Sequence, residues 1–331
     1  MTSPAPGPPR ANALAWRRAL RWLAVLAVQG AVAYYIVRTI LEHQAALREL
    51  PYLDGGFLAT LAAVSVLYGA SLALPGLGWT ILMAAFSHHP VAWRHGLWVF
   101  GQTLTAKYLP GNVFQFVGRH WLGMRLGWSQ AGIGLATLLE TLTVVSASAL
   151  LSLIASLWME LPPLGSLPAW AYLPLGVGGL ALPFVFLRGW NLAPVRRLRS
   201  RWSPEARPLP ERTLLLSLSA YLLFLLASAA MLWALAAQLS GRVELRDVQL
   251  CLAAYGVIYF LGFVLPGAPG GLGVREALII LMLGPALGEG VAAAAAMAFR
   301  LATVCGEVLV FLVTLRLAPQ AASSIRHNAT R

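Results

Sequence analysis

Several charged side chains lie inside or beside long apolar runs of this sequence, where a membrane makes charge costly. Two of them follow matching Leu-Pro-Gly motifs, each nine residues after the proline: Arg119 in KYLPGNVFQFVGR and Arg275 in LPGAPGGLGVRE. Arginine forms paired, charge-assisted hydrogen bonds with phosphate. The other candidates of this kind are Lys107, Glu140, Glu276, Arg300 and Glu307. Together they predict a polar site for an anion within an apolar protein.

The backbone of the two motifs favours the same chemistry. The prolines and glycines of LPGAPGGLG cannot continue a helix, and the helix that restarts after them presents free N–H groups and a positive dipole end. That combination suits an anion, especially a phosphate. The residues expected to contribute, besides the charged set, are Gly270, Gly271, Gly273, Asn112 and Gln115, with Asn112 as a helix cap. The alternative is that the glycines only allow close helix packing.

The carboxylates need partners at this depth. Glu140 lies in an apolar and hydroxyl-bearing stretch and requires a cation or a proton; Arg119 or Lys107 could supply the charge. Lys107 is the only lysine of the chain, and an interfacial position is its alternative explanation. Arg300 and Glu307 are seven residues apart and share a helix face, where an ion pair with another helix is the alternative to ligand binding.

Composition identifies a polytopic α-helical membrane protein. Of 331 residues, 59% are hydrophobic and only 11% are charged, against about a quarter charged in soluble domains. The net charge of +12 comes from arginines in short loops, which is typical of membrane orientation and not of nucleic-acid binding. Cys251 and Cys305 are expected to be buried as small hydrophobic residues. No catalytic motif, metal set or cofactor fingerprint is present.

The expected fold is an all-α membrane helix bundle with one transmembrane domain, residues 16–318. A disordered cytoplasmic tail, 1–15, precedes it, and a cytoplasmic tail, 319–331, follows it. The spans are expected at about 20–41, 56–86, 129–157, 169–187, 213–239 and 290–317. The motif regions, 91–128 and 248–283, consist of apolar halves too short to cross a hydrocarbon core of about 30 Å. They are therefore expected to form re-entrant hairpins.

The arginines indicate the orientation. With both termini cytoplasmic and a basic cytoplasmic loop at 188–212, fifteen arginines fall on the cytoplasmic side and four on the outer side. The protein is accordingly expected in the cytoplasmic (inner) membrane. The two hairpins then enter from opposite sides, an arrangement typical of inverted-topology repeats with a site at mid-membrane.

The two motifs resemble the transmembrane domain of lysylphosphatidylglycerol synthases/flippases and its stand-alone bacterial relatives. The resemblance covers roughly residues 15–318 and is most specific in PGGLGVRE. It implies movement of a charged phospholipid, or another lipid-linked substrate, between leaflets. By position it implies roles for Pro110 and Gly111 as well as for most of the residues above. No aminoacyl-transferase domain follows the membrane part, so aminoacyl transfer is not expected.

The resulting hypothesis is a transporter or flippase that moves a phosphate-bearing phospholipid or polyprenyl-linked lipid. The cations would hold the anion, while Glu140, Glu276 or Glu307 would balance charge, hold a cationic headgroup moiety or carry a coupling proton. One alternative is an intramembrane lipid-modifying enzyme with paired carboxylates as acid and base. Another is a non-transporting partner of an envelope lipid synthase. A membrane lipid is the expected partner, with a homo-oligomer as a further option.

Overall fold

Five apolar helical segments are long enough to cross a membrane in the part of the chain that the structure describes. They are Gly55–Phe86, Gln130–Ile154, Glu211–Ser240, Leu245–Gly262 and Glu289–Leu317. This computed structural model describes residues 55–87, 90–108, 113–156, 181, 184–185, 188–189, 192, 210–242, 244–264 and 273–319. All of these belong to one compact unit, Gln44–Arg331. The prediction of a multi-pass helical membrane protein is confirmed.

Several predicted features fall on other residues. The first span, 20–41, both tails and most of the span 169–187 and of the basic loop 188–212 lie outside the described residues. The same holds for the Leu-Pro-Gly turns themselves, 109–112 and 265–272. The structure therefore describes the helices on either side of each motif.

The first described span is made of two helices, α3 (Gly55–Ser71) and α4 (Ala73–Phe86), which meet at Leu72. Pro75 explains the interruption, because it has no N–H and its ring clashes with the carbonyl four residues earlier, that of Ser71. The interruption leaves Leu72 and Pro75 beside the cavity described below.

The first motif region contains two short helices. α5 (Trp93–Leu104) continues into the 3₁₀ turn η1 (Thr105–Tyr108), and α6 (Phe114–Arg125) follows the motif. At 1.5 Å per residue each α-helix extends about 18 Å, well short of a hydrocarbon core. These lengths fit a hairpin that does not cross.

The second motif region differs from its expectation. α11 (Leu245–Val264) has 20 residues and is long enough to cross a membrane, whereas α12 (Val274–Leu287) has 14. The prediction that both apolar runs beside this motif are too short is therefore wrong for α11. The predicted region begins at residue 248, whereas the helix begins at Leu245, with Arg246 and Asp247 in its first turn.

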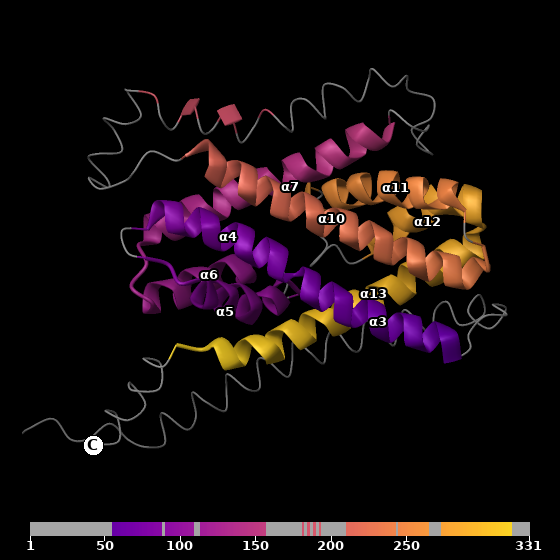
Figure 1. Ribbon diagram of the computed structural model, residues 1–331, viewed down its shortest axis with the longest axis horizontal. Coiled ribbons are helices and arrows are strands. Elements are labelled where there is room, and N and C mark those ends of the chain that lie inside the picture. Colours follow the sequence, from indigo (N-terminus) through magenta and orange to yellow (C-terminus); the bar gives the residue numbers. More distant parts are fainter. Residues whose placement is uncertain are drawn as a thin grey trace, which may run out of the picture. The chain divides into compact units, whose positions relative to one another are not determined.

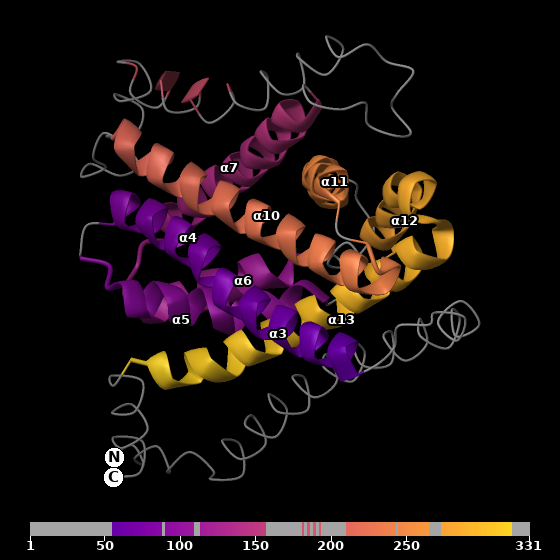
Figure 2. The ribbon, with the colours of Figure 1, turned by 45° about the vertical axis from the view of Figure 1, so that its right-hand side comes forward.

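The remaining helices form the frame around these elements. α7 (Gln130–Ser156) and α10 (Glu211–Ser240) are long, and α13 (Glu289–Thr314) ends in the turn η4 (Leu315–Leu317). α10 packs against α3, α4, α7, α11 and α13. Figures 1 and 2 show α5 and α6 grouped apart from α11 and α12, with α10 and α13 running past both groups.

α3 and α13 cross at a pair of glycines. A Cβ on Gly306 would lie 2.7 Å from the carbonyl oxygen of Ser65, and one on Gly69 would lie 3.0 Å from the carbonyl oxygen of Gly306. Only glycine permits this approach of two backbones. On the same helix the thiol-bearing Cys305 is exposed, while Cys251 of α11 is buried. The prediction of burial is thus wrong for Cys305.

Candidate functional site

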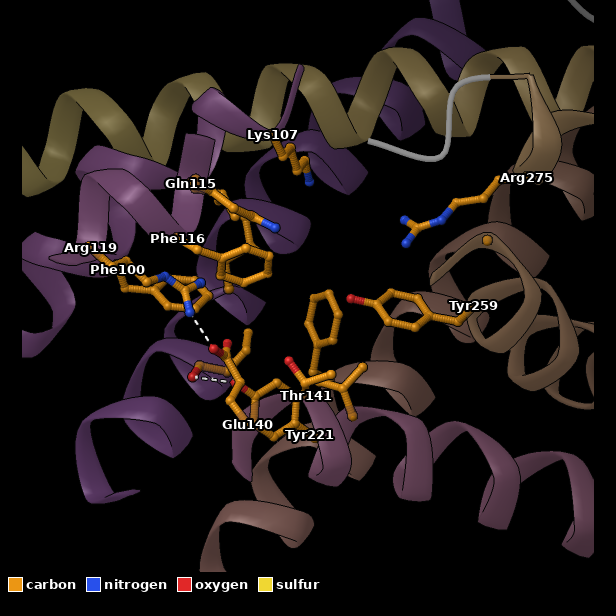
Figure 3. A pocket seen from close by; sticks show the side chains of 16 residues that line it. Phe100, Lys107, Gln115, Phe116, Arg119, Glu140, Thr141, Tyr221, Tyr259 and Arg275 are labelled. Carbon is orange, nitrogen blue, oxygen red and sulfur yellow. Dashed lines mark hydrogen bonds and ion pairs between the residues drawn. The ribbon is translucent and has the colours of Figure 1, made fainter. Parts of the chain in front are cut away.

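A polar cavity of about 90 Å³ lies between the two motif regions (Figure 3). Side chains from η1 and α6 line one side, and side chains from α11 and α12 line the other. Residues of α4, α7 and α10 complete the wall. The polar lining residues are Lys107, Gln115, Arg119, Glu140, Thr141, Tyr221, Tyr259 and Arg275.

One wall carries a buried ion pair. Nη1 of Arg119 on α6 donates to Oε2 of Glu140 on α7. The hydroxyl of Tyr221 on α10 lies 2.8 Å from Oε1 of Glu140 and 3.2 Å from the carbonyl oxygen of Pro75. Of the two cations considered as partners for Glu140, the structure shows Arg119. Two donors on two helices, α6 and α10, fix the position of this carboxylate.

The guanidinium of Arg119 also lies among aromatic rings. Its Cζ is 4.6 Å from the ring centroid of Phe100, 5.3 Å from that of Trp79 and 5.8 Å from that of Phe116. Arg119 is only 3% exposed. Ring faces attract a cation, so the ion pair and the rings together fix this side chain against the wall.

Arg275 differs from Arg119. It extends from the first turn of α12 into the cavity, opposite Lys107 and Gln115 (Figure 3). Its Cζ lies 4.4 Å from the ring centroid of Tyr259. Its Nε is buried and makes no hydrogen bond, and no described carboxylate pairs with it. Arg275 is therefore a half-buried cation without a protein counterion in the described part of the chain.

The surroundings hold Arg275 in this direction. A Cβ on Gly262 of α11 would lie 2.8 Å from Cγ and 2.9 Å from Nε of Arg275, so the missing side chain leaves room for the arginine stem. Behind Tyr259, the rings of Tyr255, Phe224 and Phe299 pack in tilted and edge-to-face contacts, at centroid distances between 5.7 and 6.1 Å. The cluster gives Tyr259 a rigid backing.

Two further ion pairs connect α13 to the motif regions. Nζ of Lys107 lies 2.5 Å from Oε1 of Glu307, and Nε of Arg300 lies 3.2 Å from Oε1 of Glu276. The second contact is not aligned as a hydrogen bond. Arg300 and Glu307 lie on one face of α13, and each forms an ion pair with a different motif region. Neither residue lines the cavity.

The start of α12 also departs from its expectation. The Gly273 N–H donates to Oε2 of Glu276 at 2.8 Å, so this backbone donor is not available to a ligand. Gly273 has a φ of 81°, which favours glycine. Glu276 thereby caps the helix and pairs with Arg300 without lining the cavity. In this structure the N–H of Gly273 is bonded to Glu276, and the ligand contact predicted for Gly273 stays a prediction.

The predicted site residues fall into three groups. Lys107, Gln115, Arg119, Glu140 and Arg275 line one cavity, whereas Gly273, Glu276, Arg300 and Glu307 do not. Asn112, Gly270 and Gly271 lie outside the described residues, as do Pro110 and Gly111.

Sequence reasoning missed Thr141, Tyr221 and Tyr259. Tyrosines in the interior of apolar spans, away from the ends, were the available signal, since a buried hydroxyl needs a partner.

The charges of the site do not cancel. The seven charged residues predicted for the site are four cations and three carboxylates, and Arg275 is the cation without an ion pair among the described residues. Uncompensated buried charge is costly, and an anion in the cavity removes that cost. Within the same residues no group of three His, Cys, Asp or Glu side chains could hold a metal ion.

Comparison with protein-family models and with curated proteins finds no match to this chain. The resemblance to the lysylphosphatidylglycerol synthase/flippase membrane domain therefore stays a prediction from the two motifs.

Proposed function

We propose that this protein moves a lipid with an anionic, phosphate-bearing headgroup between the leaflets of the cytoplasmic membrane. The observation that carries the proposal is Arg275: a half-buried arginine with a buried, unbonded Nε and no counterion among the described residues, in a cavity inside a bundle of membrane-crossing helices. A phosphodiester brings the single negative charge that this cavity lacks. Phosphate also accepts the forked hydrogen bonds of a guanidinium.

The other lining groups fit the same ligand. Lys107 and Gln115 face Arg275 across the cavity and offer further N–H donors (Figure 3). One water occupies about 10–15 Å³ of such a volume, so about 90 Å³ has room for several waters or for a compact phosphate group. Acyl or prenyl chains do not fit there and would remain in the surrounding lipid.

The arrangement of the helices suits movement. α6 lines one side of the cavity and α11 and α12 line the other, and they do not pack closely against each other. In our proposal the two motif regions are corresponding elements of inverted repeats, and one rocks against the other to open the cavity to each leaflet in turn. The first motif region is re-entrant in this proposal, whereas α11 of the second is long enough to cross. The cytoplasmic location of both termini belongs to the proposal and rests on the arginine distribution.

The test is translocation in reconstituted vesicles. Phosphatidylglycerol with a fluorescent acyl chain is quenched from outside, and the protected fraction reports movement between leaflets. Arg275→Gln and Arg119→Gln are each expected to lower the initial rate at least tenfold. Arg125→Gln, on the same helix as Arg119 but with an exposed side chain over Trp121, is the matched control and is expected to match the wild type.

Two results would overturn the proposal. One is a wild-type rate no higher than that of protein-free vesicles. The other is a wild-type rate in both Arg275→Gln and Arg119→Gln. Mass spectrometry of the recovered lipid separates transport from lipid modification, because transport leaves the mass unchanged.

A further inference from the structure

Three buried carboxylates lie beside the cavity or behind it, and they differ in how well they are held. Glu140 accepts hydrogen bonds from Arg119 and Tyr221. Glu276 accepts one from the Gly273 N–H and pairs with Arg300. Glu307 has Lys107 as its only ion-pair partner among the described residues, and its Oε2 makes no hydrogen bond. Glu307 is the carboxylate most dependent on a single partner.

That partner is shared with the cavity. Lys107 lines the cavity and donates at the same time to Oε1 of Glu307 behind it. Its side chain is 15% exposed, whereas that of Glu307 is 2% exposed. An anion in the cavity can therefore reach Lys107 but not Glu307. The ligand and Glu307 therefore compete for Lys107.

The other groups around Glu307 do not replace Lys107. Tyr68 of α3, Tyr108 of η1 and Tyr255 and Tyr259 of α11 surround it without a positive charge; the hydroxyl of Tyr108 can offer a hydrogen bond only. Neither Arg275 of α12 nor Arg300 of α13 pairs with Glu307. An anion that draws Lys107 into the cavity leaves Glu307 buried without a counterion. A buried, unpaired charge is costly, and a carboxylate escapes the cost by taking up a proton.

We propose that binding of an anionic headgroup at Lys107 is coupled to protonation of Glu307. This inference rests on the proposed function, and it identifies the proton as the ion that is coupled to lipid binding. In the empty protein Glu307 is charged and paired with Lys107. In the loaded protein Lys107 holds the anion and Glu307 carries one proton taken from water. Binding therefore consumes a proton, and release of the headgroup returns it.

Linkage sets the sign and the size of the pH effect. A ligand that binds with uptake of one proton loses affinity as pH rises, by about tenfold per pH unit where uptake is complete. A transmembrane proton gradient would then favour loading on the acidic side and release on the other. Transport would run without any nucleotide.

The experiment measures binding of short-chain phosphatidylglycerol to the purified full-length protein by calorimetry, in buffers of different ionisation enthalpy and over a range of pH. The wild type is expected to take up about one proton per lipid and to bind more weakly at high pH. Glu307→Gln mimics the protonated acid, so it is expected to take up no proton and to keep its affinity at high pH. Glu289→Gln, an exposed acid on the same helix, is expected to behave as the wild type.

Each alternative result has a distinct meaning. Binding by the wild type without proton uptake overturns the coupling and leaves the proposed function standing. Uptake that persists in Glu307→Gln overturns the assignment to this residue. Absence of any binding by the wild type overturns both proposals. If Glu307→Gln does not fold, the double variant Lys107→Gln/Glu307→Gln removes both charges together, and a proton taken up by it on lipid binding would equally overturn the assignment.

Discussion

Arg119 and Arg275 line the same cavity from two different motif regions, but only Arg119 is paired with a carboxylate. This asymmetry divides their roles. Arg119 joins α6 to α7 through Glu140 and is held by aromatic rings. Arg275 carries the unbalanced charge that an anionic ligand requires. The expected consequences differ for stability and for binding.

Removal of one member of the Arg119–Glu140 pair is expected to destabilise the fold. Arg119→Met leaves Glu140 buried without its cation, and breaking such a pair costs about 3–5 kcal/mol. Tyr221→Phe removes a single hydrogen bond to the same carboxylate and is expected to cost about 1–3 kcal/mol. Unfolding by denaturing detergent in mixed micelles measures both.

The double variant Arg119→Met/Glu140→Leu provides the control for this pair. It removes both charges, so its destabilisation is expected to be smaller than that of Arg119→Met alone. Additive losses would contradict a direct interaction between the two side chains.

The charged candidates could be found from sequence because charge in an apolar span is rare. Lys107, Arg119, Glu140 and Arg275 stand out in that way, and all four line the cavity. Glu276, Arg300 and Glu307 stand out equally but form ion pairs away from it. The sequence does not tell whether a charged side chain faces a ligand or forms an ion pair with another side chain. That depends on which helices pack against each other in the fold. Tyr221 and Tyr259 were missed because a tyrosine in an apolar run carries no comparable signal.

Element lengths were also only partly predictable. The ranges 129–157 and 213–239 correspond closely to α7 and α10, because long apolar runs have few alternatives in a membrane. The region predicted at 248–283 leaves out the start of α11, where Arg246 and Asp247 interrupt the apolar run. In the structure the helix begins before them and buries Asp247. Charged residues near a span end can lie within a helix, and hydropathy alone does not separate that case from a loop.

Substitution at the crossing of α3 and α13 is expected to affect the fold more than the site. A Cβ on Gly306 would lie 2.7 Å from Ser65 O and 2.8 Å from the backbone nitrogen of Gly69, so Gly306→Ala must separate two backbones. Overpacking of this kind costs about 1–3 kcal/mol. Gly290→Ala on the same helix has open space around its Cβ and is expected to be neutral or slightly stabilising. Detergent unfolding of the two variants makes the comparison.

Membrane exposure of α13 can be checked at Cys305. A spin label there, with Cys251→Ala as background, is expected to report high accessibility to oxygen and low accessibility to a polar nickel chelate. The reason is that Cys305 is exposed on an apolar span that also exposes Leu309 and Leu312, and a helix face of this kind is directed toward lipid. A label placed at Leu245, at the start of α11 and 76% exposed, provides the comparison. Equal accessibility of Cys305 to both reagents would contradict a lipid-facing position.

Gly262→Ala is expected to change ligand binding with little change in stability. Its Cβ would meet the middle of the Arg275 side chain, 2.8 Å from Cγ and 2.9 Å from Nε, and not a backbone. The arginine can rotate away, so the free energy of unfolding is expected to change by less than about 1 kcal/mol, as when a side chain adjusts its rotamer. The guanidinium then leaves its place over Tyr259, and the affinity for short-chain phosphatidylglycerol is expected to fall about tenfold, since 1.4 kcal/mol corresponds to that factor.

Gly134→Ala on α7, with open space around its Cβ, serves as the control. Unchanged affinity in Gly262→Ala would show that the direction of Arg275 does not determine binding, and loss of folding would show that this contact is structural.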